Sequence, residues 1–295
     1  MFVHGFPDLA IGWHHQLQAV AAAGFHVIAP DMRGYGGSSC PHPVDAYTLS
    51  ELTGDLVALL DALNIGKAVF VGHDWGGFVA WAMPVLHPDR VAGMVGICTP
   101  YIPFPSVALH TDLVKGEIER QYVSWFQKPD LAESAMDPHA SAIVSKIMRK
   151  AVPLTEVYQR AFADGKLNMN PFIDAASPDG LGEPLLDDNL FAHYVEAYAR
   201  TGYRGGINWY RNIDANAARH PDVGVAPLDI PCLMITAELD PGLRPEFAAD
   251  MPERCSNLEM HMIKDAAHWV AQENPAEVNT LILDWLARQY CSGTE

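Results

Sequence analysis

The sequence predicts an α/β protein with a mostly parallel sheet, flanked by helices and interrupted by a helical insertion. Short apolar segments alternate with helical patterns, which is typical of a parallel sheet covered on both faces. A run of β-forming residues enters the glycine-bounded segment 72–76, and a helix-like stretch follows it. Strand character fades after residue 98 and resumes near residue 232. With 295 residues, 49% of them hydrophobic, the chain can bury a substantial core.

The first part of the chain carries a regular alternation of strand and helix signals. A first strand ends at the turn His4-Gly5-Phe6-Pro7, and the first helix is closed by Gly24. The second helix carries leucines at the i, i+3, i+4 spacing of an amphipathic helix. In chain order we expect strands at residues 1–3, 25–29, 68–71 and 91–98, and helices at residues 13–23, 49–63 and 78–86.

The middle of the chain differs in character from both ends. Residues 99–211 have helical periodicity and several prolines, so we interpret them as an inserted helical lid, or cap. Strand signals return at residues 232–236 and 258–263, and residues 275–290 form a last helix. We therefore expect residues 1–98 and 212–295 to form one α/β core and residues 99–211 to form the cap.

The composition of the chain limits which binding partners and which cellular location we expect for the protein. A net charge of −17 argues against nucleic acid and anionic membranes and favours an uncharged substrate. No window approaches about 20 uncharged apolar residues, and no secretion signal is visible. The five cysteines are odd in number and form no C-x-x-C pair, which favours reduced, mostly buried thiols in a cytoplasmic protein. No metal-binding histidine spacing occurs, so we expect neither metal nor cofactor.

Asp74 is the residue that most informs the chemistry. It stands between Gly72 and Gly76 in a strand–turn–helix context, the one in which the motif G-x-Ser-x-G places a Ser nucleophile on a strained, exposed turn. The turn packs too tightly for a Cβ at the flanking glycines. A carboxylate with a reference pKa near ~3.9 is already ionised at pH 7 and needs no base before it attacks. Its natural target is an sp³ carbon with a leaving group, and the product is an ester on the enzyme. The alternative is an Asp that only caps the following helix.

Two further groups follow predicted strands, at the edge where a parallel sheet binds its ligand. Asp240 follows the strand at 232–236, and His268 follows the strand at 258–263. The order nucleophile, acid, histidine is the one used by this arrangement of elements. We expect His268 to act as general base for a water molecule and Asp240 to orient the imidazole. An Asp-Pro turn and a capping His are the structural alternatives.

An ester carbonyl also needs donors for its developing oxyanion. The backbone N–H of Trp75 is one candidate, because it directly follows the nucleophile. The turn at residues 4–7 supplies the second, for which we select the N–H of Phe6.

These motifs, together with two segments of the insertion, resemble the microbial epoxide hydrolases of the α/β-hydrolase superfamily along nearly the whole chain. The matching residues are His4-Gly5-Phe6-Pro7, Gly72-His73-Asp74-Trp75-Gly76-Gly77, Asp240, His268 and the segments 121–129 and 208–212. The resemblance implies that Tyr122 and Tyr210 donate hydrogen bonds to the epoxide oxygen. A phenol with a pKa of about 10 suits this role, because an opening epoxide releases an alkoxide that needs a proton. Trp125 and Trp209 are expected to wall the substrate pocket, and packing is the alternative for all four aromatics.

The expected reaction is therefore the hydrolysis of a small uncharged epoxide by water to a vicinal diol. One alternative is a haloalkane dehalogenase, which uses the same Asp-Trp pair but has no need of two lid tyrosines. The other is a catalytically silent α/β-hydrolase fold that serves as a binding module.

The sequence departs from the family at its start. Relatives usually have two further strands before the His4-Gly5 turn, so we expect these N-terminal edge strands to be missing. The strand at residues 25–29 would then lie at the edge with unpaired backbone groups. Either the natural start lies upstream, or another surface, such as the partner subunit of a homodimer, covers the edge.

Overall fold

The computed structural model describes residues 1–290, and the chain divides into two compact units. The first, here called the sheet unit, comprises Met1–Met32, Leu52–Ile102 and the chain from Asp222 onward. The second, here called the helical unit, comprises Arg33–Glu51 and Pro103–Pro221. No helix in the described part of the chain is both long and apolar enough to cross a membrane.

The sheet unit is built on five parallel strands in the order β1-β2-β3-β4-β5, among the residues described. The strands are β1 (Phe2–Val3), β2 (Ala68–His73), β3 (Val91–Ile97), β4 (Leu228–Ala237) and β5 (Cys255–Ile263). In register, His73 lies opposite Ile97, Ile97 opposite Ile235, and Ala237 opposite Ile263. The strands thus end at a common edge, and the residues that follow them are brought together there.

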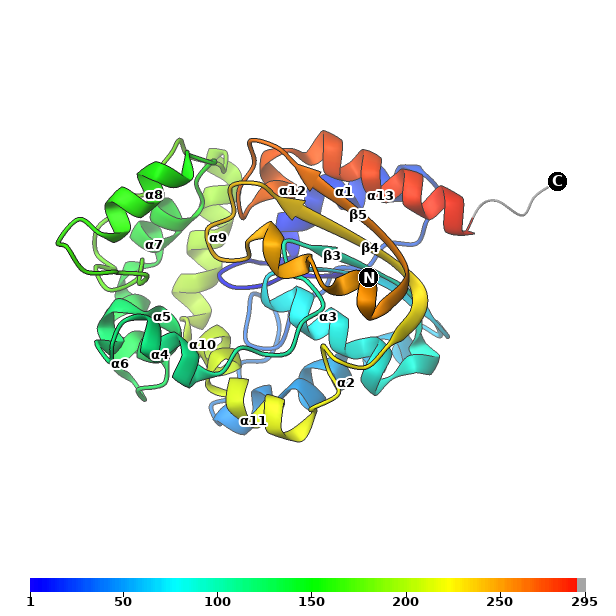
Figure 1. Cartoon of the computed structure of the whole chain (residues 1–295), viewed down its shortest axis with the longest axis horizontal. Helices are drawn as coiled ribbons and strands as arrows, with labels where there is room; N and C mark the ends of the chain where they lie inside the picture. The colour runs from blue at the N-terminus through cyan, green and yellow to red at the C-terminus, as the bar shows by residue number, and fades with distance from the viewer. Residues whose placement is uncertain (291–295) are drawn as a thin grey trace. The chain divides into compact units, whose positions relative to one another are not determined.

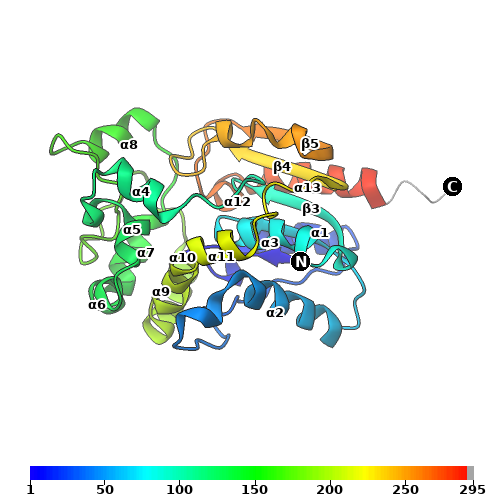
Figure 2. The same ribbon diagram turned by 60° about the horizontal axis from the view of Figure 1, so that its bottom comes forward.

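Helices cover both faces of this sheet (Figures 1 and 2). They are α1 (His14–Ala22), α2 (Leu49–Ala62), α3 (Trp75–Leu86), α12 (Val270–Glu273) and α13 (Pro275–Tyr290). In β3, a Cβ at Gly93 would meet Trp285 of α13, whereas a Cβ at Gly96 would meet Trp81 of α3. Residues at positions of opposite parity point to opposite faces of a strand, so α13 and α3 pack on opposite faces of the sheet.

One hydrophobic core cluster of the sheet unit lies on the face covered by α1, α12 and α13. It joins β-branched and leucine side chains of the strands to aromatic and aliphatic side chains of these helices. Its fully buried members include Val95, Ile97, Leu233, Ile235, Ile263, Ile282 and Trp285. Strands buried on both faces read as continuous apolar runs, which explains why the sequence signal was clear for β2, β3 and β4.

The expected strand at residues 25–29 is wrong: the structure has no strand there. The N–H of Phe2 donates to Ile28 O over 2.7 Å, so the segment runs beside β1. This single bond does not make a ladder, because β1 is only two residues long. The helix after the nucleophile begins earlier than expected, at Trp75 rather than residue 78.

The described elements of the helical unit are helices. They are α4 (Val107–Leu113), α5 (Tyr122–Phe126), α6 (Leu131–Met136), α7 (Ala140–Ile147), α8 (Leu154–Ala161), α9 (Asp188–Thr201), α10 (Arg204–Arg211) and α11 (Ile213–Arg219), with short 3-10 turns between them. The segment Arg33–Glu51 also belongs to this unit. Its Arg33 carbonyl accepts from Trp209 Nε1 at 3.3 Å, and its Leu49 N–H donates to Asn216 Oδ1 at 2.9 Å.

Four of the five cysteines lie in the described part of the chain, and all four are free thiols. Cys98, Cys232 and Cys255 are buried, and Cys40 is exposed. Cys291 lies outside the described residues.

Candidate active site

Asp74 occupies a strained turn between β2 and α3. Its backbone has φ 52° and ψ −127°, a conformation that a non-glycine residue adopts only when its surroundings enforce it. A Cβ at Gly72 would lie 2.4 Å from Gly76 O, and a Cβ at Gly76 would lie 2.0 Å from Val3 O. The absence of side chains at both glycines therefore lets β2, the turn and β1 approach closely, as the sequence predicted.

The Asp74 carboxylate is held by backbone donors. Oδ1 accepts the N–H of Phe6 at 2.8 Å, and the N–H of Trp75 also bonds the carboxylate. The expected oxyanion donors are thus both brought to the nucleophile. Burial raises the pKa of Asp74 above its usual value, while His268 and the two N–H groups oppose this rise.

His268 links Asp74 to Asp240 within the sheet unit. Its Nδ1 lies 2.8 Å from Asp240 Oδ2, and its Nε2 lies 3.6 Å from Asp74 Oδ2. Asp240 is fully buried, and its Oδ1 accepts the N–H groups of Gly242 and Leu243, each at 2.9 Å. Because an ionised carboxylate can only accept, Nδ1 carries the proton in this bond and Nε2 faces the nucleophile.

Interactions between the charges of Asp74, His268 and Asp240, here called the relay, set the pKa values of these three residues. Burial alone would raise the pKa of Asp240, but His268 and the two backbone donors hold it well below its usual range. Burial alone would likewise lower the pKa of His268, yet Asp240, its hydrogen bond and Asp74 together raise it to about 9. The relay therefore favours an imidazolium between two carboxylates as long as Asp74 is charged.

Several supporting residues of the relay were not predicted from sequence. His73 Nε2 lies 2.7 Å from the carbonyl of His268, and burial together with the neighbouring His268 lowers its pKa to about 3. The thiol of Cys98, which directly follows β3, contacts the same carbonyl at 3.6 Å. Thr99 Oγ1 donates to Asp74 O at 2.8 Å. The signal that could have found Cys98 and Thr99 is their place at the carboxyl end of a strand.

The turn that carries Phe6 is fixed by a buried histidine. His4 Nε2 accepts the N–H of Met32 at 3.0 Å, so its Nδ1 carries the proton that Gly5 O accepts. Burial lowers the pKa of His4 to about 4, which keeps the ring neutral at physiological pH. The Phe6–Pro7 peptide bond in this turn is cis.

One cluster in the described residues has the composition of a metal site. Ligand atoms of His73, Cys98 and His268 lie within 4.8 Å of one another. Both histidine rings and the thiol already take part in the hydrogen bonds of the relay. We therefore interpret the cluster as support for His268.

The predicted lid residues lie in the helical unit. Tyr122, at the start of α5, and Tyr210, near the end of α10, have ring centroids 5.6 Å apart in an edge-on arrangement. Trp125 and Trp209 are both buried, and Trp209 meets the ring of Tyr35 edge-on at 5.4 Å. The expected roles of these four aromatics toward substrate stay predictions.

Comparison with known proteins agrees with this geometry. The sequence profile of the alpha/beta hydrolase fold matches residues 1–275. Epoxide hydrolase A of Mycobacterium tuberculosis is 37% identical, over 97% of this chain and 89% of its own length. The crystal structure of Epoxide Hydrolase A from Mycobacterium thermoresistibile superposes with a TM-score of 0.84 at 36% identity, covering 97% of this chain and 89% of that one.

A similar match extends to mammals. Bifunctional epoxide hydrolase 2 of Sus scrofa is 32% identical over 96% of this chain, and the chain spans 50% of that relative's length. The chain therefore belongs to the α/β-hydrolase family, and it is similar along nearly its whole length to microbial epoxide hydrolases of that family.

Proposed function

We propose that this protein hydrolyses an uncharged epoxide to a vicinal diol through a covalent ester on Asp74. The observation that carries the proposal is the state of the Asp74 carboxylate. One oxygen is held by the N–H of Phe6, and the other lies 3.6 Å from His268 Nε2. A carboxylate at this position is suited to attack carbon, and the neighbouring base is suited to free the resulting ester.

In the first half-reaction Asp74 Oδ2 attacks one epoxide carbon, and the bond from that carbon to the epoxide oxygen breaks. The oxygen takes a proton as it leaves, and we assign this donation to Tyr122 and Tyr210. Support for the pair comes from the resemblance of their segments to those of epoxide hydrolases and from their edge-on contact in the helical unit. On the same resemblance we propose that residues 99–211 form the cap. We also propose that Trp125 and Trp209 line the substrate pocket.

In the second half-reaction a water molecule attacks Cγ of the Asp74 ester while His268 Nε2 takes its proton. The charge that develops on Oδ1 is stabilised by the N–H of Phe6, and we assign the second donation to the N–H of Trp75, which also bonds this carboxylate. Collapse of the intermediate breaks the ester bond, and the departing diol oxygen takes the proton back from His268. Asp240 holds the ring and stabilises the imidazolium throughout.

The first step also prepares the second. In the free enzyme the pKa of His268 is raised to about 9, in part by the charge on Asp74. Ester formation removes that charge, so the pKa of His268 falls and the ring becomes a better base. The proton that His268 releases replaces the one that the tyrosines gave to the epoxide oxygen. The total number of protons on the site and its bound substrate therefore stays the same.

A product assay tests the proposal against its alternatives. The protein is offered styrene oxide and 1-bromobutane in separate reactions. Formation of 1-phenyl-1,2-ethanediol without bromide release is the expected result. Bromide release would make the protein a haloalkane dehalogenase, and the absence of both products would make it a binding module.

Two further expectations from the sequence remain proposals. A cytoplasmic location is supported by the four free thiols of the described residues, since oxidising compartments favour disulfides. A homodimer is tested by light scattering on the purified protein.

A further inference from the structure

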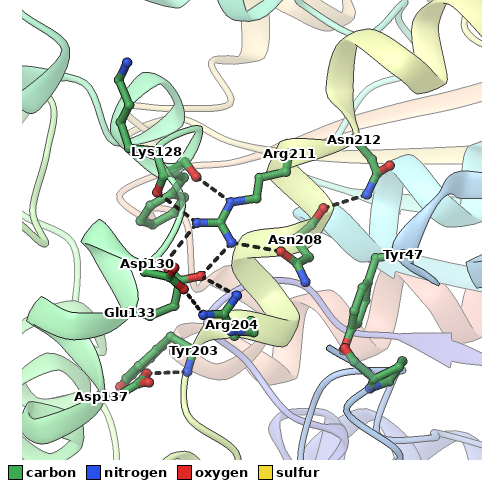
Figure 3. A network of polar contacts seen from close by, with 12 residues as sticks. Tyr47, Lys128, Asp130, Glu133, Asp137, Tyr203, Arg204, Asn208, Arg211 and Asn212 are labelled. Atoms are coloured by element: carbon green, nitrogen blue, oxygen red, sulfur yellow. Dashed lines mark hydrogen bonds and ion pairs between the residues drawn. The ribbon is translucent and has the colours of Figure 1, made fainter. Parts of the chain in front are cut away.

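Arg211 is a buried arginine in a network of polar contacts (Figure 3), and it links α10, which carries Tyr210, to the end of α5, which carries Tyr122. Arg211 ends α10, and its side chain is 6% exposed. Its guanidinium uses all five of its N–H donors. Nε bonds Phe126 O at 2.8 Å, and the terminal nitrogens bond Glu133 Oε1 at 2.6 Å, Asn208 Oδ1 at 2.9 Å, Lys128 O at 3.0 Å and Glu133 Oε2 at 3.0 Å.

Two acceptors of Arg211, the carbonyls of Phe126 and Lys128, lie where α5 ends, and the others are Glu133 on α6 and Asn208 on α10 itself. The carbonyl of Phe126 is one of the last in α5, and carbonyls at helix ends lack intrahelical partners. Glu133, on α6, is 5% exposed and holds Arg211 in a two-pronged pair. Its Oε1 also lies 3.5 Å from Arg204, which bonds Asp130. Two arginines and two carboxylates therefore balance their charges in this network.

A second link runs directly to a tyrosine. Gln127 Nε2 donates to Val123 O at 2.9 Å and to Tyr210 O at 3.1 Å. It thus bonds the backbone of α5 and the backbone of Tyr210 at once. Together with the Arg211 bonds, this fixes α10 against the end of α5, directly beside Tyr210 and four to six residues after Tyr122.

The aromatic rings next to these links form a compact set. Phe126 lies 5.7 Å from Tyr122 and 5.0 Å from Tyr210, and the tyrosine rings are 5.6 Å apart. All three contacts are close to edge-on, with interplanar angles of 72° to 79°. A shift of α10 along α5 would therefore change the separation of the two phenols.

We propose that Arg211 and Glu133 are positioning residues that set the geometry of Tyr122 relative to Tyr210 and thereby the rate of epoxide opening. The proposal rests on the function proposed above for the tyrosines. Hydrogen-bond catalysis is sensitive to such geometry, because a misplacement of about 1 Å can cost about 100-fold in rate. A lysine cannot replace Arg211, since it has three donors from one nitrogen in place of a planar fork.

The test separates the two half-reactions in single turnovers with enzyme in excess over styrene oxide. Ester formation is followed by the mass of the adduct, and ester hydrolysis by its decay. Glu133→Gln places an amide N–H₂ group against the Arg211 donors and removes the negative charge that balances the guanidinium. We expect ester formation to slow by about 10- to 100-fold and hydrolysis to change less than twofold. Arg211→Lys should act in the same direction.

Asp164→Asn is the matched control. Asp164 also accepts a two-pronged arginine pair, from Arg120 at 3.0 and 2.5 Å, but its side chain is 56% exposed. The same carboxylate-to-amide change there should leave both steps unaltered. Gln127→Ala provides a milder probe that removes no charge, and we expect a three- to tenfold loss confined to ester formation. Thermal melting by circular dichroism verifies that each variant is folded.

A double-variant cycle shows whether the effect passes through the tyrosines. If it does, Tyr210→Phe costs less in the Glu133→Gln background than alone, because the geometry it depends on is already lost. Equal slowing of both half-reactions, or additive losses in folded variants, would overturn the proposal. If Tyr210→Phe and Tyr122→Phe leave ester formation unchanged in the parent protein, the tyrosine assignment itself fails. If those slow it while folded Glu133→Gln and Gln127→Ala do not, only the positioning role fails.

Discussion

Replacing Asp240 with Asn tests the electrostatic logic of the relay while keeping its shape. Asp240 Oδ1 accepts the N–H groups of Gly242 and Leu243, and Oδ2 faces His268 Nδ1 at 2.8 Å. An Asn keeps its single oxygen on the two backbone donors and turns its N–H₂ group toward Nδ1. His268 Nδ1 must then accept, so the proton moves to Nε2. The nitrogen that should take a proton from water would carry one itself.

The size of the effect follows from the pKa of His268. Its rise from 6.5 to about 9 corresponds to roughly 3 kcal/mol of preference for the imidazolium. Asp240 is the largest of the causes that raise this pKa, so most of this stabilisation is lost in Asp240→Asn. Loss of roughly 3 kcal/mol slows a step that forms imidazolium by about 100-fold. The wrong tautomer adds to this, as in the serine-protease triad, where the equivalent change costs about 10⁴-fold.

We therefore expect ester hydrolysis in Asp240→Asn to slow by about 10²- to 10⁴-fold. Ester formation should slow by less than about tenfold, because Asp74 attacks without a base. Rapid quenching after mixing with styrene oxide, followed by intact-mass measurement, gives both rates. Adduct should accumulate in the variant and remain transient in the parent. Equal slowing of both steps, or unchanged hydrolysis, would refute the reasoning.

Three further predictions concern the base, the tyrosines and pH. His268→Gln should still form the ester but retain the adduct mass, and absence of adduct would contradict the role of His268 as hydrolytic base. Phe at Tyr122 or Tyr210 should slow ester formation by about 10- to 10³-fold, with the double variant slower still and hydrolysis nearly unchanged; equal losses in both steps would mean that the tyrosines only support structure. Because the folded pKa of His268 is raised to about 9 from 6.5, its contribution to stability is full below pH 6.5 and is lost as pH rises toward 9. The free energy of unfolding of the parent minus that of His268→Gln should therefore fall by up to roughly 3 kcal/mol over that range, and urea titrations showing a pH-independent difference would contradict it.

The sequence was informative where a short local pattern of residues determines the structure. The elbow around Asp74 needs glycines at fixed positions, and β2 to β4 are apolar runs, so both could be predicted. The order Asp74, Asp240, His268 placed all three residues after strands that the structure aligns at one edge.

The sequence was uninformative where contacts between residues far apart in the chain determine the local structure. Residues 25–29 are β-forming, yet a two-residue β1 gives them one backbone bond and no ladder. The segment Arg33–Glu51 joins the helical unit through bonds to residues more than 160 positions away, at Asn216 and Trp209. The contacts of His73 and Cys98 with His268 O likewise span 195 and 170 positions, and no local sequence motif predicts them.

The covalent role of Asp74 is tested most directly by a single turnover in ¹⁸O-labelled water with enzyme in excess. If Asp74 attacks the epoxide, the new oxygen of the first diol comes from its carboxylate, and that diol carries no label. The label should appear instead in the peptide that contains Asp74. A labelled first diol with an unlabelled Asp74 peptide would show direct attack by water and would contradict the account.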